Sequence, residues 1–140
     1  MSQLVLDEHI DRQLVLLPIR QWIPAQPIQD LCGNQLLHDE RVPEILLTLR
    51  QPTFVTIDQD FWHRHWCHPS YCILFFPMRS REQQCIPDLL RALLHRPEFR
   101  TRAARMGKLA RIRPTIIEFW QYPPRRLHSI AWQGAARRKR

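Results

Sequence analysis

The chain has 140 residues, of which 44% are hydrophobic, and a formal net charge of +8. This length fits one domain with a sizeable core, and the apolar fraction is ordinary for a globular protein. No apolar stretch approaches the roughly 20 residues that cross a bilayer, which argues against a membrane protein.

The first residues lack a basic segment followed by a long apolar run, so we expect no signal peptide and a cytoplasmic location. In that compartment the four cysteines are expected to be free thiols.

Charge is unevenly distributed along the sequence. Residues 1–78 hold five basic and nine acidic side chains, whereas residues 79–140 hold sixteen basic and four acidic ones. The acidic half is suited to cations, and the basic half is suited to neutralising several phosphates of a polyanion. The alternative is that the arginines only solubilise a helix face.

The first half of the sequence alternates short apolar runs with helical patterns. Residues 4–6 predict a buried strand, and residues 10–19 predict a short helix. Residues 22–31 contain two prolines and predict a loop or a poor edge strand. A turn is predicted at residues 33–34, and Asp39 is predicted to cap a helix that continues to residue 50.

The second half continues the alternation. The predicted central strand, residues 53–57, is an apolar, β-branched run. Gly107 is expected to stop a short helix before it. In chain order, the remaining predictions are a loop at 61–69, a strand at 71–76, a helical region at 80–94, a short helix at 97–106, and strands at 109–112 and 116–120.

This order of elements predicts one α/β domain over residues 1–122. Its architecture is expected to be a three-layer α/β/α sandwich around a mainly parallel central sheet. Residues 123–140 are predicted to form a basic C-terminal tail, partly disordered, because residues 125–140 hold six Lys and Arg and no acid.

Carboxylates follow two of the predicted strands. Asp7 follows the first strand, and Asp58 and Asp60 follow the central one. Because the crevice of a parallel sheet lies beyond the carboxyl ends of its strands, we expect these side chains to meet Asp39 at one edge. Neighbouring carboxylates repel one another, and a hard cation such as Mg²⁺ removes that conflict. The alternative is that each acid is an ordinary cap or loop residue.

Four segments of the chain carry motifs in a defined order. They are residues 6–10 (LDEHI), 39–46 (DERVPEIL), 55–61 (VTIDQDF) and 73–80 (ILFFPMRS). In this order they resemble segments of the small PIN-like proteins, which are relatives of the VapC-type toxin nucleases. The family's TxDxDF element, which residues 55–61 match, is the most specific of the four. The resemblance covers residues 3–120.

This resemblance implies a PIN-like fold and hydrolysis of RNA phosphodiesters that depends on Mg²⁺ or Mn²⁺. By position, Asp7, Asp39, Asp58 and Asp60 match the family's catalytic and metal-site acids, and Glu40 is the alternative to Asp39. The family also implies that the protein is the toxin of a toxin–antitoxin pair. An antitoxin protein is then a partner, and a homodimer is the expected assembly.

The basic half supplies a predicted phosphate-binding stripe. In the first hypothesis this stripe holds RNA while the acids and their cation hydrolyse it. In the alternative, the chain is a catalytically inactive PIN-like module that binds nucleic acid or protein through its arginine-rich second half. The stripe comprises Arg96, Arg100, Arg102, Arg105 and Lys108.

The loop at residues 61–69 is rich in His and Trp. The spacing of its His and Cys residues matches neither a C-x2-C pair nor a helical H-x3-H pair, so the pattern does not favour zinc. We expect the loop to lie beside the acidic edge, with His63 or His65 able to touch a substrate phosphate. Trp62 and Trp66 are candidates for stacking on bases, and packing is the alternative.

Overall fold

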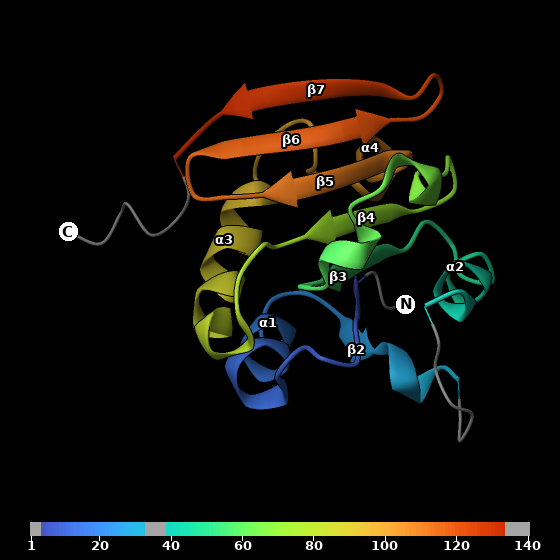
Figure 1. Cartoon of the computed structure of the whole chain (residues 1–140). Helices are drawn as coiled ribbons and strands as arrows, with labels where there is room; N and C mark the ends of the chain where they lie inside the picture. Colours follow the sequence, from blue (N-terminus) through green and yellow to red (C-terminus); the bar gives the residue numbers. More distant parts are fainter. Residues whose placement is uncertain (1–3, 33–38, 134–140) are drawn as a thin grey trace.

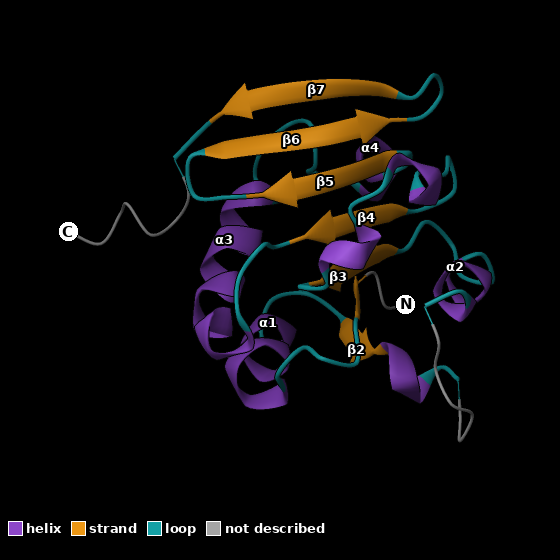
Figure 2. Cartoon of the chain, in the orientation of Figure 1, coloured by secondary structure: helices purple, strands orange, loops and turns teal. Residues whose placement is uncertain are grey.

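The structure is a computed structural model that describes residues 4–32 and 39–133. Within them, seven strands form one sheet in the order β2-β1-β3-β4-β5-β6-β7 (Figures 1 and 2). The strands are β1 (Leu4–Leu6), β2 (Ala25–Pro27), β3 (Thr53–Thr56), β4 (Cys72–Phe75), β5 (Lys108–Ile112), β6 (Ile116–Gln121) and β7 (Arg126–Ala131).

The sheet is mixed. β1 to β5 pair in parallel, whereas β6 and β7 add to one edge in antiparallel pairings. The antiparallel pairings join five and six residue pairs, and each parallel pairing joins only three or four. The α/β class is therefore confirmed, but the prediction of a mainly parallel sheet is wrong. The physical reason is the short connections at residues 113–115 and 122–125, which can only form hairpins.

The α-helices are short: α1 (Leu17–Arg20), α2 (Arg41–Leu46), α3 (Ile86–Leu93) and α4 (Arg102–Arg105). A π-helical turn at Arg12–Leu16 leads into α1, and a 3₁₀ helix at Ser80–Cys85 leads into α3. Among the described residues, no helix has the length and apolar character that crossing a bilayer requires.

Two predicted helices are shorter than expected. α2 ends four residues before residue 50, and the chain then passes through Gln51, whose φ of 49° is incompatible with a right-handed helix. α4 covers only four residues of the predicted helix at 97–106. Gly107 follows it with a φ of 86°, and a Cβ there would lie 2.3 Å from the Tyr122 carbonyl oxygen, so only glycine fits.

Buried side chains alternate along the strands and form two cores, one on each face of the sheet. One core includes Leu6 and Val55 and packs against α1 and α3. The other includes Val5 and Phe54 and packs against α2 and the 3₁₀ turns that follow β3. β1 and β4 are apolar throughout because both of their faces are covered.

The domain extends beyond the boundary predicted at residue 122. β7 lies inside the segment predicted as a tail and pairs with β6 over six residues. Trp132, which is 9% exposed, then packs into the core that contains Leu6. The flanking arginines concealed this strand in the sequence. The rest of the predicted tail, residues 134–140, and the turn predicted at 33–34 lie outside the described residues.

Candidate metal centre

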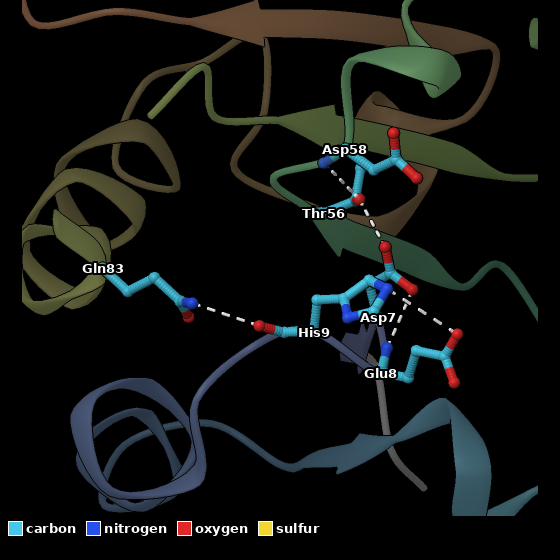
Figure 3. Close-up of polar contacts among 6 residues, drawn as sticks. All are labelled: Asp7, Glu8, His9, Thr56, Asp58 and Gln83. Atoms are coloured by element: carbon cyan, nitrogen blue, oxygen red, sulfur yellow. Dashed lines mark hydrogen bonds and ion pairs between the residues drawn. The ribbon is translucent and has the colours of Figure 1, made fainter. Parts of the chain in front are cut away.

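The carboxyl ends of β1 and β3 are joined by one hydroxyl group. Asp7 follows β1, is 5% exposed, and accepts hydrogen bonds from Thr56 Oγ1 (2.6 Å) and from the Glu8 backbone N–H (2.8 Å) (Figure 3). Thr56 Oγ1 in turn accepts a hydrogen bond from the Asp58 backbone N–H (2.9 Å). The Thr56 hydroxyl therefore fixes the position of both acidic segments relative to each other.

The turn after β3 is held by an aromatic anchor. Phe61 is fully buried and packs edge-on against Phe54, with 5.2 Å between the ring centres. The Trp66 indole N–H donates to the Asp60 carbonyl oxygen (3.0 Å), and the Asp58 carboxylate accepts from the Asp60 backbone N–H (2.9 Å). Asp58 therefore caps the 3₁₀ turn at Gln59–Phe61 with one oxygen only.

Asp39 reaches the same place from a different part of the chain. It lies just before α2, which buried apolar residues attach to the sheet. One carboxylate oxygen from each of Asp39, Asp58 and Asp60 lies within 4.8 Å of the other two. We call these three residues the aspartate cluster. The sequence predicted that Asp39 caps α2, and this prediction is wrong. The N-cap residue is Glu40, and no side chain forms a capping hydrogen bond there.

The structure therefore separates the four predicted acids into two groups. Asp39, Asp58 and Asp60 form the cluster, whereas Asp7 is buried next to it and connects to Asp58 through the Thr56 hydroxyl. Glu40, the alternative to Asp39, is not among the clustered ligands.

Desolvation and mutual repulsion act on these carboxyl groups. Desolvation raises the pKa of Asp39, and the nearby charges of Asp58 and Asp60 raise it further. Burial raises the pKa of Asp7, and its hydrogen bonds from Thr56 and Glu8 only partly oppose the rise. Among the described residues, no ion pair involves any of the four predicted acids.

The cluster fits a hard divalent cation. Oxygen ligands lie at about 2.0–2.1 Å from Mg²⁺, so two ligands of one ion are separated by up to about 4 Å and need only small adjustments from the spacing found here. A set of carboxylates alone suits Mg²⁺ or Mn²⁺ better than zinc. The exposed positions of Asp39 and Asp60 also leave room for water ligands.

A buried glutamine that the sequence did not reveal holds the loop after β1. Gln83 is 1% exposed, and its amide N–H donates to the His9 carbonyl oxygen (3.1 Å) (Figure 3). Its amide oxygen accepts from the Asp11 backbone N–H (2.7 Å). Asp11 then caps the next helical turn by accepting from the Leu14 N–H (2.9 Å). Gln83 thus fixes the segment that carries Asp7.

The predicted phosphate-binding stripe does not form a continuous exposed surface. Arg105 is a core residue, 2% exposed, that donates to Thr53 Oγ1 (2.8 Å) and the Phe99 carbonyl oxygen (3.0 Å). Three others donate to backbone carbonyl oxygens: Arg100 to His95, Arg102 to Arg50, and Lys108 to Ala104. Arg96 pairs with Glu98 at 3.2 Å.

The basic residues of the predicted stripe lie at the end of the sheet opposite to the aspartate cluster. Arg102 and Arg105 bind residues that precede or begin β3, and Lys108 is the first residue of β5. They therefore lie at the amino ends of the parallel strands, whereas the aspartate cluster lies at the carboxyl ends.

The His- and Trp-rich loop lies beside the cluster, as predicted, since His63 and Asp60 line the same cavity. His63 and His65 stack on each other with 5.6 Å between ring centres. Trp66 packs on Phe61, so its role in the structure is packing. Cys67 donates its thiol to the Gly107 carbonyl oxygen (3.2 Å), and burial raises its pKa to about 11.

No protein-family model, curated protein or solved structure matches this chain. Fold and site therefore define the class of protein. It is an α/β domain whose mixed sheet brings three aspartates together beyond the carboxyl ends of its parallel strands.

Proposed function

We propose that this protein is a metal-dependent nuclease that hydrolyses RNA phosphodiesters, as its resemblance to the PIN-like proteins implies. The observation that carries the proposal is the convergence of Asp39 with Asp58 and Asp60 from two distant segments of the chain. The cluster lies beyond the carboxyl ends of parallel strands, where open α/β sheets form their sites. Its charges also lack ion-pair partners among the described residues.

Each acidic residue has a distinct part in this proposal. Asp39, Asp58 and Asp60 would hold Mg²⁺ or Mn²⁺, which lowers the pKa of a coordinated water and offsets charge on a phosphoryl oxygen. Asp7, with its raised pKa, is a stronger base than an ordinary aspartate, which suits a proton acceptor. Thr56 keeps the Asp7 carboxylate oriented by donating to one of its oxygens.

The biological setting belongs to the same proposal and comes from the family resemblance. It comprises the toxin of a toxin–antitoxin pair, an antitoxin protein as partner and a homodimer. A cytoplasmic location is proposed beside these and does not come from the resemblance. Cys67, Cys72 and Cys85 are free thiols in the structure, which is compatible with a reducing compartment.

The test compares the wild type with Asp58→Asn on a labelled single-stranded RNA. The asparagine oxygen can still accept the Asp60 N–H, so the turn is kept while the charge is lost. We expect cleavage with Mg²⁺, no cleavage with a chelator, and a loss of about 100-fold or more in the variant, since a ligand of the cation is removed. Asp88→Asn, an exposed acid in the first turn of α3, is the control and should cleave as the wild type does.

Equal cleavage by the wild type and Asp58→Asn would reject the nuclease proposal. RNA binding that weakens with salt, needs no divalent cation and is not followed by cleavage would instead support the catalytically inactive module.

A further inference from the structure

A cavity of about 390 Å³ opens beside the aspartate cluster, and Asp60 belongs to both. One wall is the turn after β3, and the other comes from the carboxyl ends of β4 and β5 and the residues that follow them. The lining residues include Asp60, Trp62, Phe75, Pro77, Arg111 and Arg113.

A row of paired positions crosses the sheet from the acids to this cavity. Thr56, which binds Asp7, pairs with Phe75, and Phe75 pairs with Arg111. Arg111 pairs in turn with Glu118. Because paired residues of neighbouring strands point to the same face, the row places Arg111 on the same face of the sheet as the Asp7–Thr56 pair.

The Arg111 guanidinium is held from two directions. It lies 2.7 Å from the Glu118 carboxylate and 4.7 Å from the centre of the Trp62 ring. A planar cation fixed by a carboxylate and an aromatic face loses little further entropy when it binds an anion.

Arg113 is more available than Arg111. Its guanidinium lies 4.0 Å from the same Glu118 oxygen that Arg111 binds, and 45% of its side chain is exposed. Its backbone is fixed, since its N–H donates to the Ile116 carbonyl oxygen (3.0 Å) and its own carbonyl oxygen accepts from the Trp132 indole (2.6 Å). One glutamate shared by two arginines leaves positive charge at this wall.

We propose that this cavity binds one nucleotide of a single-stranded RNA, with its phosphate on Arg113 and Arg111. The inference rests on the proposed function, because it assigns the strand-binding subsite of the same centre. The volume lies at the small end of ligand sites, which suits one nucleotide and excludes a duplex. Phe75, Pro77 and Trp62 give the cavity apolar surface for a base or sugar.

The test measures binding apart from cleavage. Fluorescence anisotropy with a short fluorescein-labelled single-stranded RNA is recorded in the Asp58→Asn background without divalent cation. Adding Arg113→Gln should raise Kd roughly tenfold, since a charged hydrogen bond to phosphate is lost. It should also reduce the slope of log Kd against log salt by about 1.

Two further variants show whether the effect belongs to the cavity. Arg91→Gln makes the same charge change on α3, away from the cavity, and should leave Kd within about twofold of the parent. An unchanged Kd in Arg113→Gln overturns the inference. An equal loss of RNA affinity in Arg91→Gln also overturns it, because the attraction would then be diffuse. An equal loss of affinity in Arg100→Gln overturns it as well, because the RNA would then bind at the amino ends of the parallel β-strands.

Kinetics distinguish a failure of this subsite from a failure of the nuclease proposal. In the active protein, Arg113→Gln should raise KM and leave kcat within about twofold, whereas Asp58→Asn should lower kcat. If the wild type cleaves RNA but Arg113→Gln binds and cleaves normally, the subsite is wrong and the nuclease proposal stands. If the wild type does not cleave but Arg113→Gln weakens binding, the subsite stands and the nuclease proposal fails.

Discussion

The charged side chains of Arg102, Arg105 and Lys108, at the amino ends of the parallel strands, are used differently from those of the aspartate cluster at the carboxyl ends. At the amino ends, Arg102, Arg105 and Lys108 each donate to a backbone carbonyl oxygen, so their cations hold chain segments together. At the carboxyl ends, the aspartate cluster forms no ion pair with any described residue. The number of charges in a segment therefore says little about which of them a ligand can reach.

Side-chain chemistry explains this difference. An arginine has five donors on a long stem, so it can reach carbonyl oxygens that the ends of helices leave without partners. An aspartate is short and only accepts, so it bonds to its own turn. Asp58 does this with one oxygen, which accepts the Asp60 N–H.

The largest change in the free energy of unfolding is expected for a substitution of Arg105. Arg105→Ala removes the guanidinium that donates hydrogen bonds to Thr53 Oγ1 and to the Phe99 carbonyl oxygen, and it leaves a cavity in a buried position. We expect the free energy of unfolding, measured with urea, to fall by about 3–5 kcal/mol. The exposed Arg100 is the control, and Arg100→Ala should cost about 0.5 kcal/mol or less. Equal losses in the two variants would contradict a structural role for Arg105.

A smaller loss is expected at Gln83, on the acidic side. Gln83→Leu leaves the His9 carbonyl and the Asp11 N–H without partners, which should lower the free energy of unfolding by about 2 kcal/mol. The neighbouring Gln84 is exposed, so Gln84→Leu is the control and should change it little. Faster hydrogen exchange at the Asp11 amide in Gln83→Leu alone would locate the loss in the loop after β1.

The sequence predicted the acids at the carboxyl ends of the parallel strands well, because the signals that mark them are local. An apolar run that ends in acid marks the end of a buried strand, and β1 and β3 end next to Asp7 and Asp58 as expected. Phe61 follows Asp58 and Asp60 and anchors their turn in the core, so the same short motif includes the residue that holds the turn in place. That Asp7 lies outside the cluster was not predictable, because its direction depends on the Thr56 hydroxyl of another strand.

The roles of the basic residues at the amino ends of the parallel strands were predicted poorly, because their hydrogen-bond partners are distant in sequence. Arg105 binds Thr53 and Arg102 binds Arg50, and no local pattern indicates either partner. Arg111 and Arg113 were missed for a related reason: what places them beside the acids is the parallel pairing of β4 with β5. The short connection before β6 did carry a readable signal, since three residues can only form a hairpin.

Divalent cation should stabilise the carboxyl-end site by an intermediate amount. At a Mg²⁺ concentration of ten times Kd, linkage adds about 1.4 kcal/mol to the free energy of unfolding, or about 3–5 °C in Tm. Scanning calorimetry at constant ionic strength measures the shift. Asp58→Asn should remove it and Arg100→Ala should not. An equal shift in Asp58→Asn would show that the ion does not bind the aspartate cluster.

The smallest effect concerns the pH dependence of Asp39. Because its folded-state pKa is raised above the ordinary 3.8, its ionisation disfavours the folded state, and stability falls as pH rises through the interval between the two values. Without divalent cation, Asp39→Asn should therefore raise the free energy of unfolding at pH 7 by about a few tenths of a kcal/mol, since Asp39 is exposed. Below pH 3.8 the gain should disappear.

Saturating Mg²⁺ should reverse the sign of this comparison, because the wild type then gains the energy of binding and Asp39→Asn loses a ligand. Urea titrations at pH 7 with Mg²⁺ and with a chelator give the two signs, and Asp88→Asn is the control whose sign should not change. If the Asp39 carboxylate destabilises the fold without Mg²⁺ and stabilises it with Mg²⁺, its role is to bind the cation. A change of the same sign in both conditions would instead make Asp39 an ordinary surface residue.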